Sequence, residues 1–296
     1  MVRWIPVIIN PAAGQKAAVL NELNQIFRPM GIRWTVEVTH GEGDASQHAK
    51  ELVAQGAEII AVYGGDGTIS EVATAIACTE SALAILPGGT GNVLAYEFQI
   101  PRKLTQAAML LTGDYHIGVF DLGQVGERKF LLRVGVGFES LVIEKSQREL
   151  KDRFGLLAYG IAGLQALREA QQMHYRLNLD GTQIEMDGVA CTIANSGHLG
   201  LPGLSLSPTV NMEDGLLDVI VLRKVDIEEL ISSLLTTSVK DYFLKGFLHW
   251  QVKKAIIDVD PPQTIQLDGD IVGSSPIEAE CIPQCLKVVV PDIIHS

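Results

Sequence analysis

The sequence predicts two domains, a doubly wound parallel α/β domain at residues 1–119 and an antiparallel β-sandwich at residues 120–296. Two observations lead to this prediction. In the first part, short apolar segments alternate with segments of helical periodicity, which is typical of a parallel sheet with helices on both faces. In the second part, short strand patterns follow one another across Gly-containing turns, which is typical of a sandwich.

The expected strands of the first domain are short, apolar and bounded by Gly, Pro or Asn. They are Trp4–Ile9, Arg33–Val38, Glu58–Tyr63 and Ala82–Leu86. The segments between them carry Leu, Val, Ala and Ile at helical spacing. These expected helices are Lys16–Arg28, Asp44–Gln55, Ile69–Ala77 and Lys103–Leu111. Because ligands bind beyond the carboxyl ends of the strands in such a sheet, a site is expected in the loops that follow the strands.

The expected strands of the second domain are joined by tight turns such as Asp180-Gly181. They are Asp121–Val125, Lys129–Val136, Tyr175–Asp180, Thr182–Met186, Val189–Ala194 and Leu217–Arg223, with further short strands from Lys253 onward. Helical patterns at Phe154–Gln172 and Asp226–Lys245 interrupt the series. Together the patterns indicate two packed domains with a cleft between them.

Composition restricts the class of protein. The chain has 296 residues, of which 47% are hydrophobic and 20% charged, as in a well-packed globular protein. The formal net charge of −12 disfavours a nucleic-acid partner, because that binding depends on Lys and Arg. Cys78, Cys191, Cys281 and Cys285 form no C-x-x-C pair, so we expect reduced thiols in a cytoplasmic protein. The longest nearly uncharged helical window is too short to span a bilayer.

The most informative motif is G-G-D-G-T at residues 64–68, which follows an apolar strand pattern and opens a helix. Backbone N–H groups at such a helix N-terminus attract phosphate oxygens. Asp66 would repel a bare phosphate, so its position makes sense chiefly where a divalent metal ion or its waters lie between them. Thr68 and Glu71 also have the spacing of a capping box. The simpler alternative is an ordinary strand-to-helix turn in which Asp66 bonds its own backbone.

Two further Gly-rich loops follow the first and fourth expected strands. They are Asn10-Pro11-Ala12-Ala13-Gly14 and Pro87-Gly88-Gly89-Thr90-Gly91-Asn92. In a parallel sheet all three loops emerge at one edge, and folding needs alone explain them poorly because each Gly costs conformational entropy. The chain has no G-x-x-x-x-G-K-[ST] motif and no G-x-G-x-x-G in its first turn, which disfavours a Walker-type NTPase and a Rossmann dinucleotide site.

These loops and other motifs resemble the diacylglycerol kinase catalytic-domain family, the soluble bacterial lipid kinases related to sphingosine and ceramide kinases. The resemblance covers nearly the whole chain in order and spacing. It includes Thr39 with Gly43-Asp44-Ala45, Asp121-Leu122-Gly123, Gly135-x-Gly137, Ala194-Asn195, Ser207-Pro208, Asp214-Gly215-x-Leu217-Asp218 and Leu267-Asp268-Gly269. It implies an N-terminal nucleotide-binding domain, a C-terminal β-sandwich for the lipid substrate, and an active site in the interdomain cleft.

The resemblance also implies a reaction, the Mg²⁺-dependent transfer of the ATP γ-phosphoryl group to a lipid hydroxyl, with diacylglycerol as the leading acceptor. Asp66 would then organise the catalytic Mg²⁺ or its waters, Asp121 would join that network, and Asp270 would accept the proton of the hydroxyl. The implied nucleotide-binding residues are Asn10, Gly14, Thr39, Gly64, Gly65, Asp66, Gly67, Thr68, Gly89, Thr90, Gly91 and Asn92, with Asp44 nearby.

The chain departs from the family pattern in two places. Where the family has Asp-Gly-Glu, this chain has Asp268-Gly269-Asp270, whose last carboxylate is shorter by about 1.5 Å. A misplacement of about 1 Å can lower a rate roughly a hundredfold. The triplet can equally be a tight turn before a strand. Glu139 stands where the family more often has Asp. A regulator that binds nucleotide or lipid without catalysis is therefore a rival hypothesis.

A second metal site is implied near Asp214-Gly215-Leu216. This motif resembles the structural Mg²⁺ site of bacterial members of the family. Here such a site would use the Asp214 carboxylate and the main-chain carbonyls of Asn211 and Leu216. Oxygen-only ligands suit this ion. A plain turn into the following strand is an equally good interpretation.

A lipid substrate requires contact with a membrane surface, for which the basic and aromatic segment Lys240–Lys254 is the best candidate. The alternative is a helix that buries these aromatic side chains. We expect a cytoplasmic protein that lies transiently at the inner membrane face, and the sequence leaves a homodimer open. Other acceptors also remain open: a sphingoid base, ceramide, a glycerophospholipid or, outside the lipids, NAD.

Overall fold

The computed structural model describes residues 4–14, 18–113, 115–137, 170–201, 204–205, 207, 209–223 and 247–292. The chain forms two compact units that are each continuous in space but not in sequence. Unit 1 consists of Met1–Leu122, His198–Pro202 and Pro283–Ser296, and unit 2 of Gly123–Gly197 and Gly203–Ile282. The sequence predicted a single boundary at residue 119. The chain instead crosses between the units several times, twice within single strands, β5 (Tyr115–Val125) and β18 (Ile277–Pro291).

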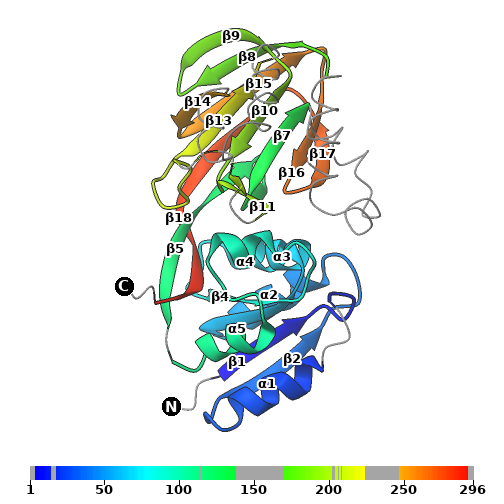
Figure 1. The fold of residues 1–296 in the computed structure, drawn as a ribbon, viewed down its shortest axis with the longest axis vertical. Helices are drawn as coiled ribbons and strands as arrows, with labels where there is room; N and C mark the ends of the chain where they lie inside the picture. The colour runs from blue at the N-terminus through cyan, green and yellow to red at the C-terminus, as the bar shows by residue number, and fades with distance from the viewer. Residues whose placement is uncertain are drawn as a thin grey trace, which may run out of the picture. The chain divides into compact units, whose positions relative to one another are not determined.

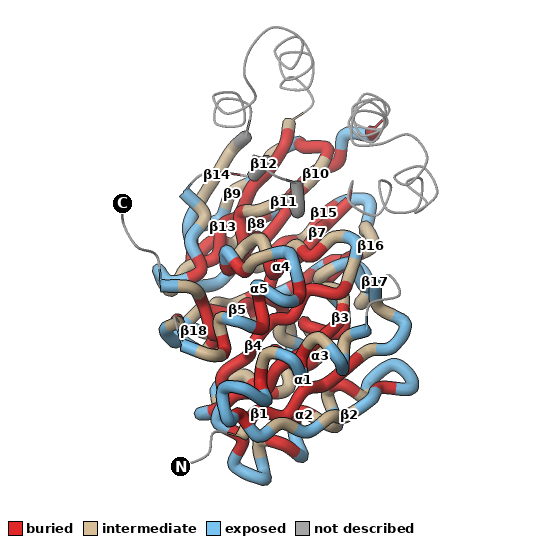
Figure 2. The backbone as a smooth tube through the Cα atoms, turned by 60° about the horizontal axis from the view of Figure 1, so that its bottom comes forward, coloured by how far each residue is buried: buried red, intermediate tan, exposed pale blue. Residues whose placement is uncertain are grey.

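Unit 1 is built on a parallel sheet in the order β2-β1-β3-β4, with which helices alternate along the chain (Figure 1). Its elements are β1 (Trp4–Ile9), α1 (Val19–Phe27), β2 (Arg33–Val38), α2 (Asp44–Ala54), β3 (Ile59–Gly64), α3 (Asp66–Ile76), β4 (Ala82–Pro87), α4 (Val93–Glu97) and α5 (Leu104–Leu110). Every residue of β3 and β4 is buried, which explains their continuously apolar sequence (Figure 2). This architecture confirms the predicted parallel α/β domain.

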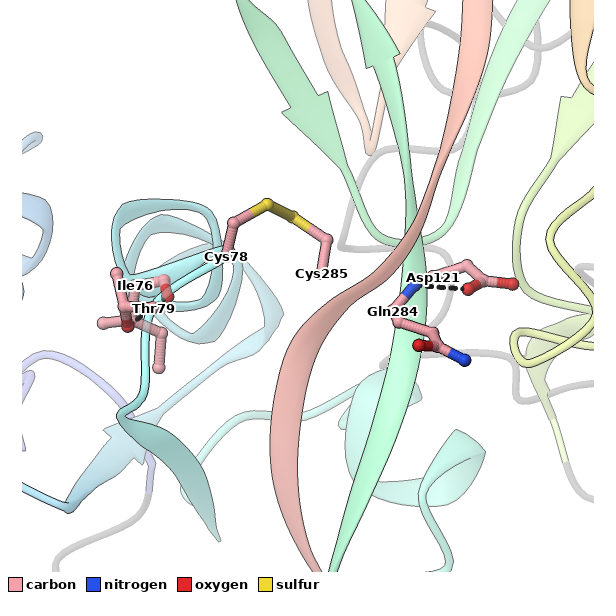
Figure 3. The surroundings of a disulfide bond; sticks show 6 residues. All are labelled: Ile76, Cys78, Thr79, Asp121, Gln284 and Cys285. Atoms are coloured by element: carbon pink, nitrogen blue, oxygen red, sulfur yellow. Dashed lines mark hydrogen bonds between the residues drawn. A yellow bond between two sulfur atoms is a disulfide. The ribbon is translucent and has the colours of Figure 1, made fainter.

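The end of β18 extends this sheet, because Lys287 and Val288 pair in parallel with Ala82 and Leu83 of β4. This pairing brings Cys285 of β18 against Cys78, which follows α3, and the two cysteines form a disulfide (Figure 3). The expectation of reduced thiols is therefore wrong for this pair. The two cysteines are 207 residues apart, so the sequence contained no local signal of their contact.

Unit 2 is an antiparallel sandwich, as predicted. One of its sheets has the order β14-β13-β10-β7-β16-β17, and the other contains β9, β8, β15 and the first part of β18. The bounds are β6 (Arg128–Phe130), β7 (Arg133–Gly137), β8 (Met173–Leu179), β9 (Thr182–Gly188), β10 (Ala190–Ala194), β13 (Leu217–Leu222), β14 (Phe247–Val252), β15 (Lys254–Asp260), β16 (Thr264–Leu267) and β17 (Asp270–Ser274). Alternate residues of these strands, such as Val134, Tyr175 and Val219, form one buried apolar core.

Two short strands, β11 (His198–Leu201) and β12 (Leu204–Ser205), pair with each other outside the main sheets. β11 belongs to unit 1, where it packs against α4. The predicted helices at Phe154–Gln172 and Asp226–Lys245 lie outside the described residues, except for residues 170–172, which are not helical.

The basic and aromatic segment at residues 240–254 is described only from residue 247. There the alternative prediction of a helix is wrong, because residues 247–252 form β14 and residue 254 begins β15. Trp250 packs against the core of unit 2, so this aromatic side chain contributes to folding. None of the helices in the described part of the chain combines the length and apolar character that crossing a membrane requires.

Candidate nucleotide-binding site

The three Gly-rich loops come together at the carboxyl edge of the parallel sheet in unit 1. They follow β1, β3 and β4, and β3 pairs with both of the other strands. The Asn10 N–H donates to the Tyr63 carbonyl at 2.9 Å, and the Gly88 N–H donates to the Gly64 carbonyl at 2.9 Å. The Asn10 side-chain amide donates to the Thr68 hydroxyl at 2.9 Å. Residues predicted from three separate segments thus form one cluster.

Helix α3 begins at Asp66, three residues earlier than the sequence predicted, and no side chain caps it. The predicted capping box is wrong, because Thr68 lies buried within the first turn and accepts the Asn10 amide. Glu71 accepts the N–H of Gly43, at 3.2 Å, instead of reaching back to its own helix. A helix N-terminus without a side-chain cap keeps its first N–H groups available to a ligand.

Close packing between the loops explains most of their glycines. A Cβ atom on Gly89 would stand 2.7 Å from the Cα atom of Gly65, and one on Gly14 would stand 2.6 Å from the Gly88 carbonyl oxygen. Gly67 differs, because nothing lies within 4 Å of the position its Cβ atom would take. Gly67 is therefore the glycine of the G-G-D-G-T turn that leaves room for a ligand instead of a neighbouring loop.

Asp66 joins the second and third loops. Its Oδ1 atom accepts the N–H of Leu94, in the first turn of α4, at 3.0 Å. This bond links two loops, so the alternative in which Asp66 serves only its own turn is wrong. A Cβ atom on Gly91 would stand 2.9 Å from the Oδ2 atom of Asp66, so the absence of a side chain there keeps space beside this oxygen. Asn92, with a φ of 51°, closes the same loop by bonding both backbone groups of Gly89.

Thr39 and Asp44 lie at the neighbouring end of β2. The N–H of Thr39, a buried residue, donates to the Ile9 carbonyl at 3.0 Å, which places it beside the first Gly-rich loop. The Asp44 carboxylate accepts the N–H groups of His40 and Gly41, at 2.8 Å and 3.1 Å. The His40 bond is the main cause that lowers the pKa of Asp44. Asp44 thus shapes the turn into α2, while Thr90 is exposed at the tip of the third loop.

Tyr63 is a residue of the site that the motifs did not reveal. A Cβ atom on Gly88 would stand 2.8 Å from the Tyr63 ring, and one on Gly14 would stand 2.6 Å from its hydroxyl oxygen. Burial raises the pKa of Tyr63, so the hydroxyl stays protonated at neutral pH. In the sequence Tyr63 is only the last residue of an apolar strand, so no local pattern distinguishes it.

Asp121 on β5 is completely buried, and its Oδ1 atom accepts the N–H of Gln284 on β18 at 2.8 Å (Figure 3). Gln284 immediately precedes Cys285, so the carboxylate and the disulfide hold neighbouring positions of β18. Among the described residues, no hydrogen bond joins Asp121 to Asp66, and no three His, Cys, Asp or Glu side chains converge as a metal site. In the described residues Asp121 therefore contacts β18 through Gln284.

In unit 2, Asp268 and Gly269 form the turn between β16 and β17, with φ angles of 51° and 104°, and Asp270 follows as the exposed first residue of β17. The buried Asp268 carboxylate accepts three backbone N–H groups at 2.8–2.9 Å. They belong to Leu131, Leu132 and Arg133. Burial raises the pKa of Asp268, and these bonds act in the opposite direction. Asp268 is thus a structural residue that holds the turn carrying Asp270.

The predicted structural metal ligands Asn211, Asp214 and Leu216 lie in one turn that leads into β13. The Asn211 side-chain oxygen accepts the Glu213 N–H at 3.1 Å. The Asp214 carboxylate accepts the Leu216 N–H at 3.0 Å and the Gln251 side-chain amide at 3.2 Å. These bonds shape the turn that leads into β13.

Three Gly-rich loops around an uncapped helix N-terminus, at the carboxyl edge of a parallel sheet, are typical of α/β proteins that bind phosphate groups. Residues 5–125 match the diacylglycerol kinase catalytic domain, and residues 133–290 match the YegS C-terminal NAD kinase beta sandwich-like domain. The chain therefore belongs to the diacylglycerol kinase catalytic-domain family of lipid kinases, which confirms the resemblance. Membership of a kinase family implies ATP as the phosphate donor.

Similar proteins match over nearly the full chain. A diacylglycerol kinase of Mycobacterium tuberculosis is 30% identical, over 97% of this chain and 95% of its own. A probable lipid kinase, YegS-like, of Pseudomonas aeruginosa is 33% identical, over 89% and 87%. A crystal structure from Bacillus anthracis, assigned as a diacylglycerol kinase, has a TM-score of 0.83 and 25% identity, over 98% and 97%.

Proposed function

We propose that this protein is a Mg²⁺-dependent kinase that transfers the γ-phosphoryl group of ATP to the hydroxyl of diacylglycerol, giving phosphatidic acid. The observation that carries the proposal is the cluster of three Gly-rich loops around the N-terminus of α3, with Asp66 in its first turn. The relatives named as diacylglycerol and lipid kinases support a lipid acceptor.

In this proposal the loops of unit 1 bind the nucleotide. The open N-terminus of α3 at Gly67 would take phosphate oxygens, while Asn10 and Thr68 keep the first two loops together. Asp66 fits Mg²⁺, because its Oδ1 atom is fixed by Leu94, its Oδ2 atom borders the space beside Gly91, and Mg²⁺ bound to phosphates needs only one or two carboxylates. Bound Mg²⁺ would offset the negative charge of the transferred phosphoryl group.

The acceptor side of the proposal is Asp270. Its carboxylate would accept the proton of the lipid hydroxyl as the hydroxyl oxygen bonds to the γ-phosphorus and ADP leaves. The buried Asp268 supports this assignment, because its three backbone hydrogen bonds fix the turn that carries Asp270. In this proposal Asp121, which is oriented by its bond to Gln284, also belongs to the water network around Mg²⁺.

Three further elements belong to the proposal. A structural Mg²⁺ would bind the Asp214 carboxylate and the carbonyls of Asn211 and Leu216. The segment at residues 240–254 would make a peripheral membrane contact, as suits an enzyme that works transiently at the inner membrane face. The chain would act as a monomer or as a homodimer, and a measurement of its mass in solution distinguishes the two.

A second candidate function is phosphorylation of NAD, which the name of the matched C-terminal domain favours. Labelled ATP supplied with either dioleoylglycerol in mixed micelles or NAD separates the two. We expect Mg²⁺-dependent label in phosphatidic acid and none in NADP. Label only in NADP would refute the lipid proposal. ATP binding without phosphorylation of any lipid in a panel that includes ceramide and sphingosine would favour the regulator hypothesis.

A further inference from the structure

The sheet β14-β13-β10-β7-β16-β17 has two different faces. Alternate residues of its strands, such as Val134 and Leu267, point into the apolar core of unit 2. Arg133 on β7 and Gln266 on β16 lie on the opposite face. Gln266 pairs with Gly135, two residues from Arg133 on the same face. The two polar side chains therefore flank a position that has no side chain of its own.

This second face is buried but not fully hydrogen-bonded. Gln266 is only 4% exposed, and its side-chain oxygen has no hydrogen-bond partner within the described chain. The Nη1 atom of Arg133 is likewise buried and without a partner there. Buried polar groups are normally bonded, so each exception calls for an explanation. A cationic donor and a neutral acceptor beside a glycine suit a polar ligand with both an acceptor oxygen and a hydroxyl.

Arg133 is also linked to the turn that carries Asp270, the proposed proton acceptor. The Arg133 N–H donates to the Asp268 carboxylate at 2.9 Å, and the Asp268 N–H donates back to the Arg133 carbonyl at 3.0 Å. Asp270 follows two residues later, at the start of β17. Arg133 on β7 and Gln266 on β16 thus stand on paired strands, and β16 also pairs with β17, which carries the proposed base.

We infer that Arg133 and Gln266 bind the headgroup of the acceptor lipid, an ester-linked glycerolipid. This inference rests on the proposed function and names the substrate class of its acceptor site. The Arg133 guanidinium donates to an ester carbonyl oxygen of the lipid, and the Gln266 side-chain oxygen accepts from its hydroxyl. Both are positioning residues, because they hold the lipid and do not take part in proton transfer.

The test compares the full-length wild type with Arg133→Gln, Arg133→Lys and Gln266→Met. Each is assayed with labelled ATP and mixed micelles that contain either dioleoylglycerol or sphingosine at varied surface concentration. Loss of a charge-assisted hydrogen bond should raise the KM for dioleoylglycerol about tenfold to a hundredfold in Arg133→Gln, with the KM for ATP unchanged. Arg133→Lys, which keeps the charge, should restore part of this loss. Arg176→Gln, an exposed arginine paired with Asp258, is the matched control and should behave like the wild type.

The outcomes separate this inference from the proposed function. An unchanged KM for dioleoylglycerol in folded Arg133→Gln, or a wild type that prefers sphingosine, overturns the inference and leaves a lipid kinase. A wild type that phosphorylates no lipid refutes the proposed function and the inference with it. If Arg133→Gln does not fold, judged by its melting temperature, Gln266→Met must show the raised KM; otherwise the inference fails.

Discussion

In unit 1 the groups that would meet a ligand are mostly backbone atoms held by close packing, whereas in unit 2 they are side chains beside a turn. The glycines at positions 14 and 89 let the Gly-rich loops touch, so they set the shape of the cluster of loops. Around Asp270 the shape comes from one buried carboxylate, Asp268, that collects three N–H groups. In the proposed function, phosphate recognition would therefore depend on the fold of the backbone, and recognition of the acceptor lipid on individual side chains.

The largest effect is expected at Asp270, because the proposed function assigns proton transfer to this one side chain. Asp270→Asn cannot accept a proton and should lower kcat about 10²–10⁴-fold, without changing ATP affinity. Single-turnover assays and ATP titration measure the two quantities. Asp260→Asn, another exposed aspartate of unit 2, is the control. Activity within about tenfold of the wild type would exclude Asp270 as the general base.

Asp66→Asn tests the side chain that links the second and third Gly-rich loops of unit 1. An amide oxygen can still accept the Leu94 N–H, so the fold should persist. Loss of the charge should lower kcat/KM about 10²–10³-fold, the range for removing one electrostatic contact. Kinetics at several Mg²⁺ concentrations and a melting curve measure both effects. A fall in melting temperature that accounts for the lost activity would assign Asp66 a structural role only.

Loss of the Cys78–Cys285 disulfide tests how far the cluster depends on the fold around it. Removing a disulfide that closes a long loop typically costs about 2–5 kcal/mol of stability. We expect that loss in urea unfolding of the Cys78→Ser, Cys285→Ser double variant and in the wild type with dithiothreitol. Cys281→Ser, at a cysteine outside the disulfide, is the control. Equal stability with and without dithiothreitol would show that the sheet alone holds β18.

Gly89→Ala probes the packing between loops in unit 1 directly. The new Cβ atom would stand 2.7 Å from the Gly65 Cα atom, and overpacking of this kind costs about 1–3 kcal/mol. ATP affinity should fall together with the melting temperature. Gly113→Ala, at an exposed position where nothing lies within 4 Å, should change neither. Normal ATP binding by a stable Gly89→Ala protein would contradict the close-packing explanation.

The smallest effect is expected at Asp44, a partly exposed residue at the start of α2. Because its pKa is lowered in the folded protein, its contribution to stability is present above its ordinary pKa of 3.8 and is lost as the pH falls through the lowered value. Asp44→Asn should therefore be slightly less stable than the wild type at pH 7, and the difference should vanish in acid below the lowered pKa of Asp44. Urea unfolding at both pH values measures this. A constant difference would show that the charge is not its cause.

Local sequence patterns were sufficient where burial repeats along one element. The predicted ranges Trp4–Ile9 and Arg33–Val38 match β1 and β2 at both ends. The start of α3 was placed too late, because Gly67 is a poor helix former and Thr68 has the appearance of a cap. Tertiary contacts overrode both preferences, since the Thr68 hydroxyl serves Asn10 from the adjacent loop.

By itself, the sequence determined the alternation of strands and helices, the sandwich that follows it, and the three Gly-rich loops at which we propose a phosphate site. Each of these is recorded in spacing within a few dozen residues. Only the tertiary structure decided the disulfide between Cys78 and Cys285, the bond from Gln284 to Asp121, and the burial of the Arg133 Nη1 atom and the Gln266 side chain. The first two contacts span 207 and 163 residues. Such pairs depend on how strands are ordered in a sheet, which periodicity within one segment does not specify.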